Sequence, residues 1–304
     1  MIIAITGGTG FIGKQLANQH IRLGHQVRLL SRKSPLKEEN VKFFIGDLSD
    51  PDVDLSSFLD SVDILYHCAG EINNEGLMQE LHVNGTKRLI EAAKGRIQRW
   101  VQLSSVGAYG ICRDGTITES SIENPFKIYE LSKTESDRLV KKSGIPHVIL
   151  RPSNVFGNNM PNQSLRGLIR AIYSGIFFFI GIKNESLVNY VHLVDVVNAL
   201  ICCGSDDEAL GEVFILSQQT TVEKMVASFA SGIKSNRFFF RLPEGFVRFI
   251  VSIFGFFLKF PLTSSRVDAL TGRCVYNSNK IQKTLKFKYS MTLEEGFTLF
   301  AKQK

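Results

Sequence analysis

Hydrophobic and polar positions alternate in a regular rhythm over the first half of the chain. Short runs rich in β-branched and aromatic residues predict strands, and the longer stretches between them have the apolar spacing of amphipathic helices. The expected strands are 2–6, 26–30, 41–45, 62–67, 100–103 and 147–150, and the expected helices are 11–23, 78–93 and 128–142. Gly144 and Pro146 follow the last helix and act as stop signals. Strands that alternate with helices in this way predict a doubly wound parallel sheet.

The rhythm loosens after the sixth expected strand. A passage rich in glycine, asparagine and proline comes first, and helices with isolated strands near 188–191 and 213–216 follow. We therefore expect an α/β fold with a first domain at 1–157 and a smaller, mostly helical C-terminal lobe at 158–304. The segments around 188–217 are expected to return to the first domain.

Two apolar stretches in the second half raise the question of a membrane span. Residues 176–180 are too few, and 246–260 contains both Arg248 and Lys259. Neither approaches the roughly 20 apolar residues that a span needs. We expect no transmembrane span and a buried helix in the C-terminal lobe, and contact with a membrane interface is the second interpretation.

Composition and charge narrow the class of partner. The 304 residues are 44% hydrophobic, which supplies a sizeable core. The net charge is +7 at pH 7, but the basic residues are scattered and accompany no nucleic-acid-binding motif. We expect no nucleic-acid partner, because an acidic small molecule such as a phosphorylated cofactor is a sufficient reason for the charge.

The cysteine pattern bears on the compartment. The five cysteines are odd in number and lack the spacing of metal ligands or of a disulfide framework. They are Cys68, Cys112, Cys202, Cys203 and Cys274. We expect no disulfides, no metal site and a cytoplasmic location. A strand that begins at Ile2 leaves no room for a signal peptide, which agrees with that location.

A glycine-rich turn follows the first expected strand. Gly7, Gly10 and Gly13 stand between that strand and a helix, where unhindered backbone N–H groups can meet a pyrophosphate. With Phe11 and Ile12, the stretch Thr-Gly-Gly-Thr-Gly-Phe-Ile-Gly resembles the extended short-chain dehydrogenase/reductases, the NAD-dependent epimerase/dehydratase superfamily. The resemblance implies a Rossmann domain that binds NAD or NADP.

The end of the second strand bears on which dinucleotide is bound. An NAD site usually carries an acidic residue there, whereas a basic residue suits the 2′-phosphate of NADP. This chain has Ser31, Arg32 and Lys33 and no carboxylate at that point. Because Arg32 can pair with a phosphate through two parallel hydrogen bonds, we expect NADP(H) as the favoured cofactor and NAD(H) as the alternative.

Two further stretches resemble parts of the family's cofactor site. A pair after the third strand resembles its adenine contact, and three small residues after the fourth strand let the backbone approach the cofactor. These residues are Asp47 and Leu48, followed by Cys68, Ala69 and Gly70. The neighbouring His67, at the end of an apolar strand, is interpreted as a packed residue without a chemical role.

A tyrosine and a lysine are the main catalytic candidates. Tyr129 and Lys133 stand four residues apart, so they share one face of the predicted helix 128–142 and match the family's Tyr-x-x-x-Lys motif. Hydride addition to a ketone leaves an alkoxide that must gain a proton. Tyr129 would supply it, with Lys133 and the positive nicotinamide lowering its pKa from about 10. The resemblance also implies that Lys133 holds the nicotinamide ribose.

A serine completes the constellation. Ser105 lies four residues before Tyr109, in a stretch that resembles the family's Ser-Ser-x-x-x-Tyr-Gly loop. The resemblance implies that its hydroxyl binds the substrate oxygen and stabilises the developing charge. Ser104 is the competing candidate.

Two later signatures extend the resemblance to about residue 195. Residues 151–157 are similar to Arg-Pro-x-x-Val-Tyr-Gly, which implies that Pro152 and Val155 lie beside the nicotinamide and that Asn154 faces the substrate. Residues 190–195 resemble the signature Tyr/Phe-Ile-His-Val-x-Asp.

The motifs leave several reactions open. Val106 and Gly107 stand where the family's 4,6-dehydratases carry an Asp-Glu pair, so we do not expect dehydration. The family's epimerases generally carry the acidic NAD residue that is absent here, and reductases usually draw on NADPH. We expect NADPH-dependent reduction of a keto group on a nucleotide-linked sugar. The alternatives are a nucleotide-sugar epimerase, a hydroxysteroid-dehydrogenase-like enzyme for hydrophobic alcohols or ketones, and a non-catalytic NADP-binding protein.

The sequence indicates the substrate-binding residues less clearly than the cofactor-binding ones. In many relatives an arginine that binds the diphosphate precedes the Tyr190 signature, but Val188 and Asn189 stand there in this chain. Arginines that could replace it are Arg266, which we favour, and Arg166, Arg170 and Arg273. The phenylalanine-rich segments 238–240 and 246–260 would instead suit a hydrophobic substrate. The family's habitual helix-pair contact implies a homodimer.

Overall fold

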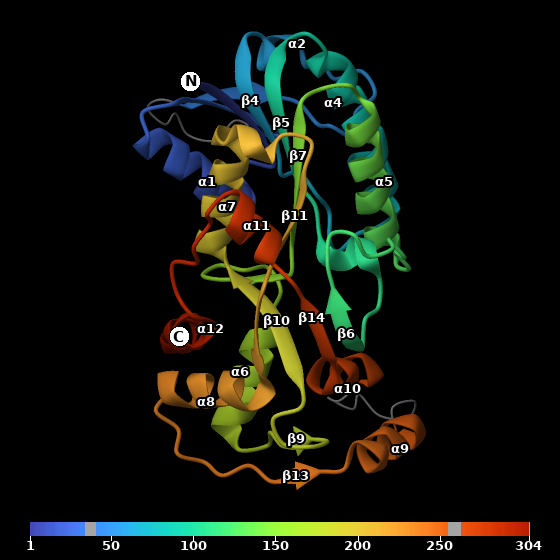
Figure 1. Cartoon of the computed structure of the whole chain (residues 1–304), viewed down its shortest axis with the longest axis vertical. Helices are drawn as coiled ribbons and strands as arrows, with labels where there is room; N and C mark the ends of the chain where they lie inside the picture. The colour runs from blue at the N-terminus through green and yellow to red at the C-terminus, as the bar shows by residue number, and fades with distance from the viewer. Residues whose placement is uncertain (34–40, 255–262, 304) are drawn as a thin grey trace.

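A seven-stranded parallel sheet forms the upper half of the molecule in Figure 1, above a second lobe. The computed structural model describes residues 1–33, 41–254 and 263–303. The strand order is β11-β7-β5-β4-β1-β2-β3. The strands are β1 (Ile2–Thr6), β2 (Gln26–Ser31), β3 (Val41–Ile45), β4 (Val62–His67), β5 (Ile97–Leu103), β7 (His147–Pro152) and β11 (Val213–Leu216). The doubly wound sheet expected from the sequence is therefore confirmed.

The strand order reverses between β1 and β4. β1 pairs with β2 on one side, from which the chain continues outward to β3, and with β4 on the other side. In open parallel sheets, ligands bind in the crevice at the carboxyl ends of the strands where the order reverses. The glycine-rich turn after Thr6 and the small residues after His67 lie at this point.

Helices cover both faces of the sheet. One apolar cluster joins Ile5 and Leu16 with Val196, and a second joins Leu89, Trp100 and other side chains on the opposite face. The helices of the first face are α1 (Phe11–Arg22) and α7 (Leu193–Ser205), and those of the second are α2 (Ser56–Leu59), α4 (Gly85–Ala93) and α5 (Ile128–Lys142). The large aliphatic and aromatic side chains that predicted the elements are those that fill this core.

The expected helix 78–93 consists of three joined segments. They are α3 (Glu75–Met78), a π-helical segment η1 (Gln79–Asn84) and α4. A π-helical turn is wider than an α-helical one, so it changes which side chains face inward, and such turns often lie at functional sites. Here the segment buries His82 against α5.

The second lobe combines small sheets with helices around a phenylalanine-rich core that includes Phe156, Phe229 and Phe297. β8, β10 and β12 form one sheet, β9 pairs with β13, and β6 pairs with β14. The strands are β6 (Asp114–Ile117), β8 (Asn154–Phe156), β9 (Phe179–Ile180), β10 (Leu187–His192), β12 (Gln218–Thr221), β13 (Arg241–Leu242) and β14 (Arg273–Tyr276). The helices are α6 (Ser164–Ser174), α8 (Val222–Gly232), α9 (Glu244–Phe254), α10 (Ser264–Thr271) and α12 (Leu293–Lys302). α11 (Asn279–Thr284) packs on β11 of the main sheet, and two 3-10 turns are η2 (Val106–Tyr109) and η3 (Asp207–Ala209).

The apolar segment 246–260 differs from its expected structure. Its described part belongs to α9, while residues 255–260, including Lys259, lie outside the described residues. Val247 is buried, but Phe246 and Phe249 are exposed, so the expectation of a buried helix is wrong for this part. Within the ranges that the structure describes, no helix has both the length and the apolar character needed to cross a membrane.

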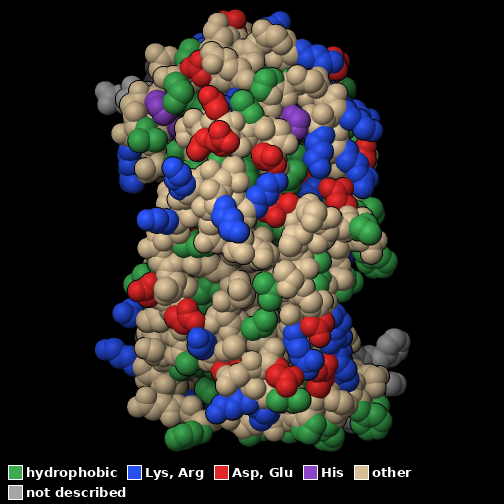
Figure 2. All heavy atoms as spheres, in the orientation of Figure 1, with side chains coloured by type: hydrophobic (Ala, Val, Ile, Leu, Met, Phe, Trp, Pro, Cys, Tyr) green, Lys and Arg blue, Asp and Glu red, His purple; other side chains and the backbone are tan. Residues whose placement is uncertain are grey.

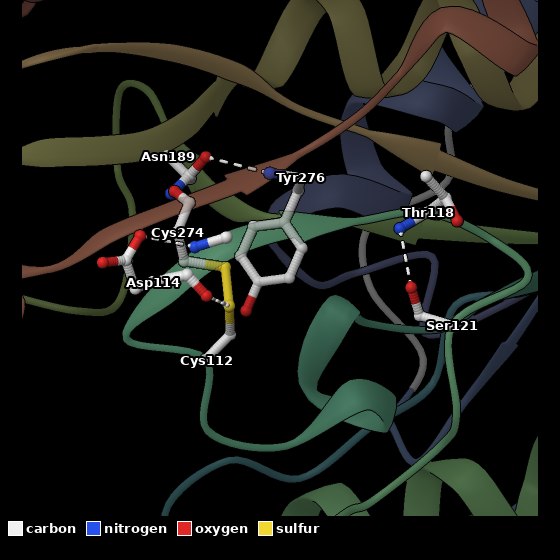
Figure 3. Close-up of a disulfide and its surroundings, with 8 residues drawn as sticks. Cys112, Asp114, Thr118, Ser121, Asn189, Cys274 and Tyr276 are labelled. Atoms are coloured by element: carbon white, nitrogen blue, oxygen red, sulfur yellow. Dashed lines mark hydrogen bonds between the residues drawn. A yellow bond between two sulfur atoms is a disulfide. The ribbon is translucent and has the colours of Figure 1, made fainter.

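A disulfide joins Cys112 to Cys274, with 5.7 Å between their Cα atoms (Figure 3). The expectation of no disulfides is therefore wrong. The parallel pairing of β6 with β14 brings the two cysteines together across 162 positions of sequence, and spacing alone does not reveal that pairing. The bond ties the segment between Ser105 and Tyr129 to the strand β14.

Candidate active site

The glycine-rich turn is closed tightly against the end of β4. Gly7 has a positive φ of 68°, and a Cβ atom there would lie 2.7 Å from the backbone nitrogen of Ala69. A Cβ on Gly13 would collide with the carbonyl oxygen of Gly7. Both positions therefore require glycine, the first for its backbone conformation and both for the close approach of backbone to backbone.

The N-terminus of α1 opens at the same edge. Gly10 is its N-cap, with no side-chain cap and no acidic residue in the first turn. The N–H of Gly10 donates to the carbonyl oxygen of Gly7 at 2.9 Å, which fixes the turn. Phe11 and Ile12 are half-buried against the core below. Backbone N–H groups and the helix dipole at such an end favour an anion.

His67 has a packing role in the structure. Its Nδ1 atom lies 2.6 Å from the Thr6 hydroxyl, and its Nε2 atom lies 3.0 Å from the Thr86 hydroxyl. Burial lowers the pKa of His67 well below its ordinary value. The backbone N–H of Ala69 also donates to Thr6, so the bonds of His67 and Thr6 hold the small-residue segment in place.

The basic end of β2 lies near the segment that follows β3. Arg32 and Lys33 are exposed, while the hydroxyl of Ser31 donates to the carbonyl oxygen of Lys33 at 2.7 Å. Partial burial disfavours the carboxylate of Asp47, but hydrogen bonds from Ser49 and the charges of Arg32 and Arg88 hold its pKa below its usual value. The neighbouring Leu48 is buried.

α5 carries the tyrosine and the lysine to the carboxyl end of β5. The ammonium group of Lys133 is buried and donates to the carbonyl oxygen of Leu103 at 2.7 Å. Burial lowers the pKa of Lys133, and the negative charge of Asp137 opposes that change. Burial raises the pKa of Tyr129 to about 12, and the negative charge of Asp137 also raises it. The nearby Ser105 hydroxyl lowers this pKa and so opposes both effects.

The two serines after β5 have different partners. Ser105 caps η2, where its hydroxyl accepts from the Gly107 N–H at 3.0 Å, and it lies close enough to the phenol of Tyr129 to affect the pKa of that group. Ser104 is buried and donates to Asp137 at 2.7 Å. The geometry thus favours Ser105, and not Ser104, as the serine that works with Tyr129.

A buried ion pair supports α5 from behind. Arg151 contacts Asp137 through Nε at 3.1 Å and through Nη2 at 2.9 Å, and both side chains are fully buried. Nη2 of Arg151 also donates to Glu123 at 2.5 Å. The arrangement anchors α5 to β7, and it explains why an arginine precedes Pro152. Sequence analysis assigned no role to Asp137, which stands one helical turn after Lys133.

His82 is a second residue that the sequence did not indicate. Its Nε2 atom accepts from the backbone N–H of Glu71 at 2.8 Å, and Nδ1 lies 2.8 Å from the Ser132 hydroxyl. Its ring meets the ring of Tyr129 edge to face, with 5.8 Å between centroids. Burial and then the charge of Lys133 lower the pKa of His82 to about 3, so its imidazole is neutral. His82 therefore connects the segment after Gly70 to α5.

The lowered pKa of His82 leads to a stability prediction. The unfolded chain, where a histidine titrates near pH 6.5, binds a proton that the folded chain excludes. Stability is therefore complete above pH ~6.5 and falls as the pH decreases, by up to about 1.4 kcal/mol per pH unit. Between pH ~6.5 and ~5, the free energy of unfolding should therefore fall in wild type by roughly 1–2 kcal/mol more than in His82→Gln. Urea unfolding at each pH measures this difference. His147→Gln is the control, and an unchanged slope in His82→Gln would refute the assignment.

The remaining predicted site residues lie on β7, β8 and α10. Pro152 is buried at the end of β7, and Val155 is half-buried in β8. Asn154 is exposed, and its amide donates to the carbonyl oxygen of Asn189 at 3.1 Å. Arg266 is exposed on α10 of the second lobe, which Figure 1 shows beside the lower end of β14. Its assignment to the substrate stays a prediction.

Asn189 and two of the arginines considered for the diphosphate have structural partners. The Asn189 amide donates to the carbonyl oxygen of Cys274 at 2.8 Å (Figure 3), so it holds β14 against β10. Arg273 pairs with Glu185 at 2.9 Å, and Arg166 lies over the ring of Phe300. Arg273 and Arg166 are therefore weaker candidates than the sequence alone indicates.

Known proteins resemble this chain over nearly its whole length. The model of the NAD dependent epimerase/dehydratase family matches residues 3–216. A UDP-glucose 4-epimerase from Vibrio cholerae is 25% identical over 97% of this chain and 93% of its own length. A dTDP-6-deoxy-L-talose 4-dehydrogenase (NAD(P)(+)) from Kitasatospora kifunensis is 32% identical over 68% of this chain and 71% of its own. Among solved structures, the UDP-glucuronic acid 4-epimerase from Bacillus cereus in complex with NAD superposes with a TM-score of 0.77 at 17% identity, covering 99% and 96% of the two chains.

Proposed function

The chain belongs to the NAD-dependent epimerase/dehydratase family, and from this premise we propose that it reduces a keto group on a nucleotide-linked sugar with NADPH. One observation carries the proposal. Ser105 lies close enough to Tyr129, at the carboxyl edge of the sheet, to counteract the rise in the pKa of its phenol, and the ammonium of Lys133 is buried one helical turn from Tyr129. An acid, an oxyanion donor and a cation thus stand at the edge where the fold binds dinucleotides.

The residues present fit a dinucleotide. The turn leaves no room for a side chain at Gly7 or at Gly13, and the uncapped N-terminus of α1 offers N–H groups to a pyrophosphate. The backbone at Ala69 lies against this turn, so the carboxyl ends of β1 and β4 meet beside the N-terminus of α1. In our proposal Asp47 and Leu48 hold the adenosine end, and Pro152 and Val155 flank the nicotinamide.

The preference for NADPH rests on the end of β2. Arg32 is exposed there and close enough to Asp47 for its charge to affect that carboxyl. A guanidinium can bind a 2′-phosphate through two hydrogen bonds, and Lys33 adds a second positive charge beside it. In our proposal these two residues and the Ser31 hydroxyl bind the phosphate.

Tyr129 is proposed as the general acid. Bound NADPH supplies a hydride to the carbonyl carbon, and the oxygen then needs a proton. Burial raises the pKa of Tyr129 to about 12, so the phenol holds its proton at neutral pH. A protonated phenol suits the reducing direction, because it donates to the oxygen as negative charge develops there.

Ser105 and Lys133 assist that proton transfer. The Ser105 hydroxyl lies beside the phenol, so one substrate oxygen placed between them can accept from both. The Lys133 ammonium favours the phenolate that Tyr129 becomes after giving up its proton, because opposite charges attract strongly where water is excluded. Its bond to Leu103 holds it at the sheet edge, where a cofactor ribose could also accept from it.

Epimerisation is the second candidate function. The relative from Vibrio cholerae that matches almost the whole chain is a UDP-glucose 4-epimerase, and that observation favours a reaction in which the sugar is oxidised and then reduced again. The relative from Kitasatospora kifunensis is a dehydrogenase named for both NAD and NADP, which favours net redox chemistry. The substrate class is common to both, since each relative is named for a nucleotide-linked sugar.

A labelled cofactor distinguishes the two reactions. NADPH deuterated at the transferred position is incubated with the protein and a nucleotide-linked 4-keto hexose. We expect one deuterium in each molecule of the alcohol product, detected by mass spectrometry, with one NADPH consumed for each product. Interconversion of two unlabelled nucleotide sugars without cofactor consumption would instead show an epimerase and overturn the reductase proposal.

A further inference from the structure

The lower end of the second lobe exposes large apolar side chains. They come from the ends of α6 and β9, from the approach to β13, and from α9. We call this set the apolar end, and it consists of Ile176, Ile182, Phe238, Phe240, Phe246, Phe249 and Ile253. Phe238 is completely exposed, and Phe249 is 63% exposed. Exposed aromatic side chains gathered in this way mark an interaction surface more often than single ones do.

The segments of the apolar end form one surface. β13 pairs with β9, and the rings of Phe178 and Phe240 stack with 5.5 Å between centroids. Arg237 reaches the carbonyl oxygen of Ser174 at the end of α6. The N–H of Gly181 donates to Leu242, directly before α9. Figure 1 shows β9, β13 and α9 together at the lower end, and Figure 2 shows apolar side chains along the same edge.

α9 is apolar on two opposite faces. Val247 and Val251 are buried against Ile180 and Val267 on β9 and α10. The outward face carries Phe246, Phe249 and Ile253, at the spacing of i, i+3 and i+7, and leaves them in solvent. A helix at the surface of a protein normally turns polar residues toward the solvent, so this exposed apolar face calls for an apolar partner.

The charges around the apolar end point to an anionic partner. Each carboxylate nearby is already paired with an arginine, and these carboxylates are Glu185, Glu223, Glu244 and Asp268. Among the described residues, by contrast, no carboxylate lies within ion-pair distance of Lys183, Lys234 or Arg237, which flank Ile182 and Phe238 of the apolar end in the sequence. Unpaired cations beside exposed aromatic rings match a surface of acidic headgroups over hydrocarbon.

We propose that the apolar end binds the surface of an anionic lipid bilayer. The phenylalanines of α9 and of the approach to β13 enter the boundary between headgroups and acyl chains, and the lysines meet the headgroup phosphates. The contact is peripheral and reversible, because it uses side chains at one end of the lobe. It does not depend on the reaction proposed above.

Vesicle flotation tests the proposal with the full chain. Vesicles of phosphatidylglycerol and phosphatidylcholine are compared with vesicles of phosphatidylcholine alone, at low and at high salt. Wild-type protein is expected to float with the anionic vesicles, and high salt is expected to weaken the binding. The double variant Phe246→Ser and Phe249→Ser should bind more than tenfold more weakly. The double variant Lys183→Ser and Lys234→Ser should lose roughly fivefold per lysine.

Matched controls separate membrane binding from unfolding and from self-association. Leu23→Ser with Ile45→Ser removes two exposed apolar side chains from the sheet domain and should float like wild type. Circular dichroism and thermal unfolding establish that each variant is folded. Wild-type protein that stays unbound with anionic vesicles would overturn the proposal. So would sedimentation showing a dimer that the phenylalanine variant dissociates, because a second copy of the chain would then be the partner.

Discussion

Tyr129→Phe is expected to lower turnover by about 10²–10⁴-fold, which is the usual contribution of a positioned general acid. The substitution removes the only proton that the ring can donate and leaves its shape. The polar contact of the phenol with Ser105 is lost, but the edge-to-face contact with His82 can remain. Because the cofactor turn lies on other elements, affinity for NADPH should change little. Single-turnover oxidation of NADPH with saturating substrate measures the effect.

Tyr173→Phe provides the matched control, since it removes the same hydroxyl from an exposed tyrosine on α6. It should retain wild-type turnover. If Tyr129→Phe turned over at a rate near wild type, Tyr129 would not be the acid, and another donor would have to protonate the oxygen. A Tyr129→Phe variant that lost NADPH binding would show a cofactor-binding role for the phenol in place of the catalytic one.

Arg32→Ala should weaken NADPH binding roughly ten- to a hundredfold and leave NADH binding within about twofold, because only NADPH carries the 2′-phosphate that a charged hydrogen bond would hold. The side chain is exposed at the end of β2, so its removal should not affect folding. Fluorescence titration with both cofactors measures the two affinities. The difference between the cofactors should shrink as salt concentration rises, since the contact is ionic.

Arg22→Ala is the control for that charge change. Arg22 lies in the last turn of α1, at the opposite end of the helix from the glycine-rich turn. It lowers the net charge equally and should leave both affinities unchanged. An equal loss of NADPH and NADH affinity in Arg32→Ala would contradict a contact with the 2′-phosphate.

The elements of the central sheet were predictable because their patterns are local. The strand 62–67 and the helix 128–142 begin and end as expected, since runs of buried β-branched residues and an apolar helix face need only local sequence. The glycine-rich turn was equally predictable, because the close backbone contact leaves no room for a side chain at Gly7 and Gly13. In the second lobe the strand expected near 188–191 is found as β10, but two-residue strands such as β9 carry too little pattern to be predicted.

The site was predictable as far as it follows from strand ends. Carboxyl ends of parallel strands share one edge, so Ser105 and Tyr129 could be expected to lie close together. The choice between Ser104 and Ser105 depended on a buried carboxylate, Asp137, that enters from α5. His82 could not be predicted, because the π-helical segment changes which side chains face inward and an α-helical period does not show this.

Long-range contacts account for the two wrong expectations. The Cys112–Cys274 disulfide depends on the pairing of β6 with β14, and four-residue strands so far apart in sequence give no sign of their partner. The exposed face of α9 was missed because apolar residues on a helix predict burial whether or not a neighbour is present. For α9 the local sequence was interpreted correctly as a helix, and the surroundings of that helix decided the outcome.

Binding of NADPH and of NADH to purified wild-type protein tests the central claim most directly. The protein is first denatured, and the released nucleotides are identified, so that any cofactor retained through purification is known. Fluorescence titration of the protein then gives both affinities. A site that exchanges freely and prefers NADPH is the result we predict for a reductase that uses Arg32. Tightly retained NAD would contradict the account and would favour an epimerase that keeps its cofactor through each turnover.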